Sequence, residues 1–161
     1  RVTGMAASGV SAGGTLAMNL AYGGNSAIPV RFVFELAAPT YFVAEDWGSL
    51  MKSDNLGSEE EFYRMMTGKE LSAQEYRQEI KKISPTCLVG EDSVPTLIGY
   101  GLKDHCVPAD QKEYLIDALE KNGVSYDYVE FPHSNHLLYG DLDKMQTFMD
   151  LSLEYCKKYF Q

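Results

Sequence analysis

The sequence predicts an α/β domain in which helices flank a parallel β-sheet. Its apolar segments are short and nearly continuous, as in residues 30–38 (VRFVFELAA), and such strands are typical of a parallel sheet covered on both faces. Between them lie segments whose apolar residues recur at spacings of three and four, which predicts helices. Strands that alternate with helices along the chain favour this class of fold.

Each element follows from its own local pattern. Four segments rich in apolar, β-branched or aromatic residues predict strands: 2–8, 30–38, 96–101 and 126–131. Three segments with helical spacing predict helices: 15–22, 111–122 and a last one that begins near Asp143. Glycines close the first two helices, at Gly23-Gly24 and at Gly123, as expected of helix ends.

Residues 40–85 break this alternation. They are charged, helix-prone and without a strand signal, so we expect a helical cap of two or three helices, inserted into a single domain that spans 1–161. The large apolar side chains of the insertion either line a pocket beneath this cap or form the core of its helices, and periodicity favours neither. These side chains are Tyr41, Phe42, Trp47, Leu50, Met51, Phe62, Tyr63, Met65 and Met66.

The charge balance excludes some classes of function. The 14 Lys and Arg residues face 23 Asp and Glu residues, and the formal net charge is −9. A binder of nucleic acid or of an anionic membrane needs a basic patch, so we expect neither partner. No apolar run approaches the roughly 18 residues of a membrane span. The three cysteines form no CxxC pair, which favours a reducing compartment and a cytoplasmic protein.

Residues 9–13 (GVSAG) match the pattern G-x-S-x-G. This pattern places a nucleophilic serine on a sharp turn between a strand and a helix, and both elements are predicted around it. Ser11 is then the candidate nucleophile, and the N–H of Ala12 is a candidate donor to the oxyanion. Gly9 and Gly13 would allow a close approach of the backbone. The alternative is that Ser11 is a turn serine that caps the helix.

A serine needs a base, and the sequence offers candidates after the third and fourth strands. Asp104 and His136 follow these strands, so both are expected at the carboxyl edge of the sheet, where open parallel sheets place functional residues. The chain order Ser11, Asp104, His136 is the order found in α/β-hydrolases. Asp104 remains open to interpretation as a surface acid. His133 and His105 compete with His136 for the role of base.

Three further side chains invite a chemical interpretation. Cys106 is a possible thiol nucleophile beside His105, but it lacks a glycine-flanked turn, which favours an ordinary packed or surface cysteine. The acidic pair in residues 141–143 favours a helix N-cap over a metal site, because no His or Cys stands at ligand spacing, and we expect no metal. Glu35 lies inside an apolar strand and needs a partner if it is buried.

At these motifs the chain resembles the α/β-hydrolase superfamily. It is most similar to the esterases, lipases and prolyl-oligopeptidase-like enzymes whose turn carries G-x-S-A-G-G, here GVSAGG at 9–14. The resemblance extends over most of the chain, including the tripeptide I-S-P at 83–85, the pattern G-x-x-D-x-x-V-P at 101–108 and the histidine loop that follows the fourth strand.

The resemblance implies a triad in which Ser11 attacks, His136 acts as general base and Asp104 orients the imidazole. It implies further that the Ala12 N–H is one oxyanion donor and that residues 40–85 cover the substrate pocket. The implied reaction is cleavage of small or medium acyl or acetyl esters through an acyl-enzyme, without a cofactor. An oligopeptidase-type peptidase acting on short peptides is the alternative.

The chain also departs from the family pattern. It has no H-G-G segment to supply further oxyanion donors and no strands before the one at 2–8, so we expect the C-terminal portion of the family fold. The strand at 2–8 would then be an apolar edge, and we expect self-association through it. The missing oxyanion donors suggest a second class of function: a weakly active hydrolase-fold fragment that serves as a binding or assembly module.

Overall fold

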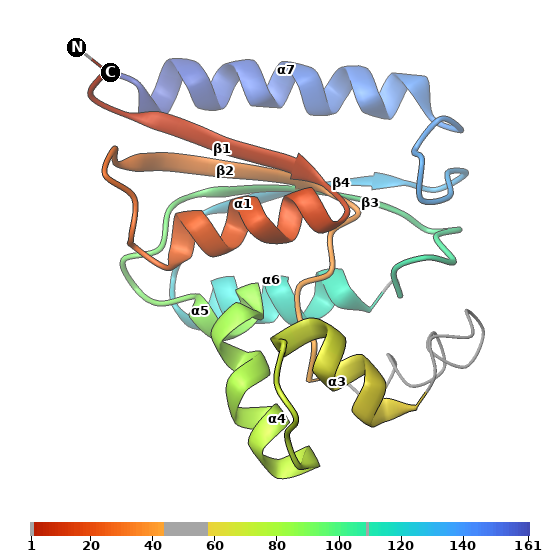
Figure 1. Ribbon diagram of the computed structural model, residues 1–161. Coiled ribbons are helices and arrows are strands. Elements are labelled where there is room, and N and C mark those ends of the chain that lie inside the picture. Colours follow the sequence, from red (N-terminus) through yellow and green to blue (C-terminus); the bar gives the residue numbers. More distant parts are fainter. Residues whose placement is uncertain (1, 44–57, 109) are drawn as a thin grey trace.

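The computed structural model describes residues 2–43, 58–108 and 110–161. Four parallel strands form one sheet in the order β1-β2-β3-β4, and helices cover both of its faces (Figure 1). The strands are β1 (Met5–Val10), β2 (Val30–Leu36), β3 (Thr96–Gly101) and β4 (Tyr126–Phe131). The flanking helices are α1 (Ala12–Tyr22), α6 (Gln111–Lys121) and α7 (Leu142–Tyr159). The predicted α/β class with a parallel sheet is confirmed.

Two apolar layers hold the helices against the sheet. All six residues of β3 are buried, as expected of a strand covered on both faces. On one face, the apolar side chains of the sheet pack against α7 in a cluster that includes Phe32, Leu97, Phe131, Phe148 and Tyr155. On the other face, α1 and α6 contribute to a cluster that includes Met18, Val33, Ile98, Leu115 and Leu119.

Some element boundaries differ from those predicted, for local reasons. The first strand runs from Met5 to Val10 rather than over 2–8, and α1 begins at Ala12, directly after Ser11. The turn between them is therefore a single residue, and the glycines that follow it lie inside the helix. β2 ends at Leu36 rather than at 38, because Ala37 adopts a left-handed φ of 51° that a strand cannot continue through.

The described part of the segment 40–85 forms helices. It contains α3 (Glu59–Thr67), α4 (Ala73–Glu79) and the single 3-10 turn η1 (Ile80–Ile83), with the short α5 (Pro85–Leu88) directly after it. Ser58 and Ser72 each begin a helix with a capping box, which stabilises helix starts in a charged segment. In Figure 1 these helices lie on the side of the sheet that carries α1 and α6, away from α7.

The insertion has an apolar core of its own, formed by Phe42, Phe62, Tyr63, Tyr76 and Ile80. Several of the large apolar side chains considered for a pocket are therefore core residues of these helices, whereas Met65 is exposed. Trp47, Leu50 and Met51 lie outside the described residues. That the insertion caps a substrate pocket stays a prediction.

Two features of the surface bear on partners. β1 forms one end of the strand order, and within the described residues it pairs with β2 alone. This is the edge position expected for the first strand, and self-association through it stays a prediction. None of the described helices combines the length and the apolarity that crossing a membrane requires.

Candidate active site

Ser11 occupies a strained backbone position between β1 and α1. Its φ of 54° and ψ of −130° lie outside the regions that non-glycine residues prefer. The position is held by hydrogen bonds on both sides: the Ser11 N–H donates to the Leu36 carbonyl at 2.8 Å, and the Gly14 N–H donates to the Ser11 carbonyl at 2.9 Å. Strand, one-residue turn and helix are the context that a G-x-S-x-G nucleophile requires.

The glycines around Ser11 do not all serve the same purpose. A Cβ at Gly9 would lie 2.2 Å from the carbonyl carbon and oxygen of Gly13, so only glycine fits there. At Gly13, by contrast, a Cβ would meet no atom within 4 Å in the described part of the chain. The close approach expected there occurs one residue later, at Gly14, where a Cβ would lie 2.6 Å from that of Ala38.

Ala12 is the first residue of α1. Its N–H therefore has no acceptor within the helix and lies at the positive end of the helix dipole. The residue is also exposed. Its role as the oxyanion donor expected from the sequence stays a prediction.

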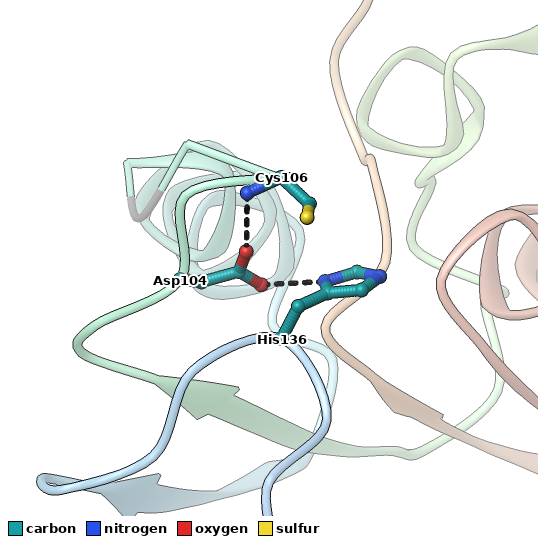
Figure 2. A group of neighbouring side chains, drawn as sticks. All are labelled: Asp104, Cys106 and His136. Atoms are coloured by element: carbon teal, nitrogen blue, oxygen red, sulfur yellow. Dashed lines mark hydrogen bonds and ion pairs between the residues drawn. The ribbon is translucent and has the colours of Figure 1, made fainter.

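Asp104 and His136 are brought into direct contact (Figure 2). Oδ2 of Asp104 lies 2.7 Å from Nδ1 of His136, and Oδ1 accepts the N–H groups of Cys106 at 2.8 Å and Val107 at 2.9 Å. The Asp104 side chain is fully buried, whereas the imidazole is 19% exposed. Three hydrogen bonds thus fix the carboxylate, and one of them orients the ring.

This contact determines where the imidazole carries its proton. A carboxylate only accepts hydrogen bonds, so the neutral ring must donate from Nδ1, which leaves the lone pair of Nε2 free. Nε2 points away from Asp104 (Figure 2). An oriented imidazole with a free Nε2 is the form that a general base requires.

Ser11, Asp104 and His136 lie at one edge of the sheet, because they follow the carboxyl ends of β1, β3 and β4, which run parallel. Within the described residues no hydrogen bond joins the Ser11 hydroxyl to the imidazole. Such contacts are often long in a free enzyme and tighten when substrate binds. Asp104 and His136 are therefore in contact, and the catalytic roles of all three residues stay predictions.

The competing histidines are placed differently. His105 is exposed on the loop after β3. His133 is also exposed, at 72% of its side chain, and its Nδ1 lies 2.7 Å from Oδ1 of Asp141. His136 is thus the one that the fold pairs with Asp104, and the pair formed by His133 and Asp141 is a separate one.

Asp141 is a residue whose role the sequence did not indicate. It stands at the N-cap of α7 but makes no capping hydrogen bond there, contrary to the expectation. Its carboxylate instead accepts the His133 N–H at 2.9 Å and the Ser134 hydroxyl at 2.6 Å. Burial opposes its ionisation, but the bonds from Ser134 and His133 outweigh that effect, so the pKa of Asp141 is lowered. Asp141 thereby fastens the loop that carries His136.

Glu35 is buried, and one of its two carboxyl oxygens has a partner. The residue is 0% exposed, and its Oε2 accepts the Ala38 N–H at 2.9 Å, whereas Oε1 has no partner among the described residues. Burial raises the pKa of Glu35 well above its ordinary value, with the Ala38 bond opposing that shift. The Tyr100 hydroxyl donates to the Ala38 carbonyl. Both side chains thus brace the turn after β2, against which Gly14 packs.

One group of side chains at the site also has the chemistry of a metal site. Ligand atoms of Asp104, Cys106 and His136 all lie within 4.8 Å of one another. Cys106 is an exposed surface cysteine, as the sequence favoured, but its closeness to the imidazole was not foreseen. Asp104 and Cys106 lie two residues apart in a loop, and a loop has no periodic pattern from which the convergence of their side chains could be predicted.

Four parallel strands, helices on both faces and the candidate residues at the carboxyl edge define an α/β-hydrolase fold. The chain belongs to the prolyl oligopeptidase family, whose match covers residues 2–161. No curated protein matches the chain.

Solved structures with this fold include esterases and peptidases. A truncated carbohydrate esterase from gut microbiota is 19% identical, with a TM-score of 0.68 over 96% of this chain and 59% of that one. A propionate-bound esterase of Thermogutta terrifontis is 22% identical, with a TM-score of 0.66 over 95% and 55%. A puromycin-hydrolysing peptidase of Mycobacterium tuberculosis is 17% identical, with a TM-score of 0.71 over 99% and 22%. The chain thus spans little more than half the length of these esterases and less of the peptidase.

Proposed function

We propose that the protein containing this chain is a serine hydrolase that cleaves small or medium carboxylic esters, including acetyl esters, through an acyl-enzyme. The observation that carries the proposal is the 2.7 Å hydrogen bond from His136 Nδ1 to the buried Asp104 carboxylate, which leaves Nε2 as a free base. Ser11 stands at the same edge of the sheet, in an unfavourable backbone conformation that persists only where the surrounding structure holds it.

The reaction proceeds in two halves. The Ser11 hydroxyl attacks the ester carbonyl carbon while its proton passes to Nε2 of His136, and the oxyanion is stabilised by the Ala12 N–H. As the C–O bond of the ester breaks, His136 returns that proton to the leaving alcohol, and the acyl group remains on Ser11. Water then attacks the acyl-enzyme, again giving a proton to Nε2, and the carboxylic acid is released with Ser11 restored.

Asp104 stabilises the imidazolium that forms in each half. Its carboxylate is already bound by the N–H groups of Cys106 and Val107, so it needs no rearrangement when the ring becomes charged. The buried position of the carboxylate strengthens its attraction to the imidazolium, since little water screens the pair.

A peptidase is the second candidate, because the family match is to the prolyl oligopeptidases. Esters and amides require the same attack, base and oxyanion donor, and differ in the leaving group that His136 must protonate. Choice between them depends on the shape of the substrate pocket. A hydrolase-fold module with little activity of its own is the third outcome.

Turnover by the full-length protein separates these candidates. We would measure kcat/KM for p-nitrophenyl acetate, p-nitrophenyl butyrate and an acyl-aminoacyl p-nitroanilide, in the wild type, in Ser11→Ala and in Ser8→Ala. Ser8 lies three residues earlier in β1 and is the matched control. An esterase prefers the acetyl or butyryl ester and loses at least about 10⁴-fold in Ser11→Ala. Preference for the anilide favours the peptidase, and turnover that survives Ser11→Ala contradicts both.

A further inference from the structure

A thiol lies beside the pair formed by Asp104 and His136, outside the hydrolytic mechanism. The Cys106 sulfur, a carboxylate oxygen of Asp104 and a ring nitrogen of His136 lie within 4.8 Å of one another. Figure 2 shows the sulfur on one side of the hydrogen bond that joins carboxylate and imidazole. Three different metal-binding atoms thus converge, from the loop after β3 and the loop after β4.

The local structure holds these three groups in place. The Cys106 N–H donates to Oδ1 of Asp104 at 2.8 Å, which fastens the backbone of Cys106 against the carboxylate. The other carboxylate oxygen holds the imidazole at 2.7 Å. Cys106 is exposed, so its side chain can rotate and a hydrated ion can reach it from solvent.

Thiolate, imidazole and carboxylate are the side chains that bind Zn²⁺, and three protein ligands with one water complete its tetrahedral coordination. Bond lengths of about 2.0–2.3 Å to Zn²⁺ place neighbouring ligand atoms roughly 3.3–3.8 Å apart. The 2.7 Å contact between Asp104 and His136 must therefore open by less than about 1 Å, and the exposed Cys106 side chain must rotate so that its sulfur, within 4.8 Å of the other ligand atoms, reaches this range.

We propose that Asp104, Cys106 and His136 form an inhibitory site for a thiophilic divalent cation, Zn²⁺ or its analogue Cd²⁺. The cation takes the place of the hydrogen-bonded proton between Oδ2 and Nδ1, because Nδ1 is the ring nitrogen that faces the carboxylate. The thiol proton of Cys106 passes to solvent when the sulfur binds.

The inhibition rests on the proposed function. A neutral imidazole that binds the cation through Nδ1 carries its own proton on Nε2. Nε2 is then a donor and has no lone pair to accept the Ser11 proton. Hydrolysis stops while the cation is bound and returns when a chelator removes it.

Direct binding tests the site without reference to activity. The full-length protein is titrated with Cd²⁺, and the ultraviolet charge-transfer band of a cadmium thiolate reports binding. We expect Cys106→Ser to abolish the band and His136→Gln to raise the Kd for Cd²⁺ at least about tenfold. Two matched controls, Cys87→Ser at another exposed cysteine and His105→Gln beside Cys106, keep the wild-type band and Kd. An unchanged Kd in His136→Gln overturns the proposal, as does a band that survives Cys106→Ser.

Inhibition is measured separately, as the Zn²⁺ concentration that halves the ester turnover of each variant relative to its own metal-free rate. We expect Cys106→Ser to raise this concentration at least about tenfold, and Cys87→Ser to leave it unchanged. Binding by a protein without turnover contradicts the proposed function and leaves the metal site intact. Turnover that Zn²⁺ inhibits equally in wild type and Cys106→Ser contradicts the inhibitory role of the site.

Discussion

Replacing Asp104 by Asn tests the acid–base pair with little change of shape. The carboxylate accepts three hydrogen bonds, two from the N–H groups of Cys106 and Val107 and one from His136. An Asn side chain has one oxygen and one NH₂ group. Because the two backbone N–H groups require an acceptor, the amide oxygen stays with them and the NH₂ group turns toward Nδ1. Nδ1 must then accept, which moves the imidazole proton to Nε2 and removes the base.

The expected cost is large for so small a change. A wrongly protonated imidazole in a serine triad lowers turnover by roughly 10⁴-fold. That factor corresponds to about 5.4 kcal/mol of transition-state stabilisation, at about 1.36 kcal/mol for each tenfold change. The assay is kcat/KM for p-nitrophenyl acetate with the full-length protein. The fold should persist, since the two backbone hydrogen bonds remain.

The control is Asp92→Asn, which removes one carboxylate at an exposed turn before β3. It should leave both kcat/KM and the unfolding midpoint within error of the wild type. If Asp104→Asn folds normally and keeps more than a tenth of wild-type kcat/KM, the role assigned to Asp104 is refuted.

Three further predictions concern the scaffold. Gly9→Ala places a Cβ 2.2 Å from the Gly13 carbonyl, so it should lower the free energy of unfolding by roughly 1–3 kcal/mol or more. Gly13→Ala meets no such contact and should be neutral or stabilising by up to about 1 kcal/mol in the same denaturant assay. Equal effects of the two substitutions would contradict the conclusion that only Gly9 is sterically required. Because the pKa of Glu35 is raised above its ordinary 4.5, the wild-type free energy of unfolding falls as pH rises from that value toward the folded-state pKa. Glu35→Gln should therefore be more stable than the wild type near pH 8, with a difference that shrinks toward pH 4. A stability difference that does not change with pH would count against the raised pKa. The isolated 161-residue chain should self-associate through the outer edge of β1, and a clean monomer by light scattering at high concentration would refute that.

The order of elements was predictable because each carries its own local pattern. Continuous apolar runs identify strands buried on both faces, and the fully buried β3 is the plainest case. The end of β2 was not predictable, since it depends on a left-handed Ala37, and alanine carries no signal for that conformation. The turn is braced by Glu35, two residues before Ala37, and by Tyr100, which is distant in sequence.

The contact between Asp104 and His136 was predictable for a topological reason. Parallel strands bring their carboxyl ends to one edge, so residues after β3 and β4 meet although 32 positions separate Asp104 from His136. The second pair, His133 with Asp141, was hidden because an acid before a helix has a simpler interpretation as its N-cap. The place of Cys106 depends on the conformation of a loop, which no periodicity encodes.

Mapping the site of covalent modification tests the central claim, that Ser11 is the nucleophile served by His136 and Asp104. The full-length protein is treated with a fluorophosphonate, digested and analysed by tandem mass spectrometry. We expect one phosphonyl adduct on Ser11, absent in Ser11→Ala and formed far more slowly in Asp104→Asn. An unmodified Ser11, or an adduct at another residue that persists in Ser11→Ala, would contradict it.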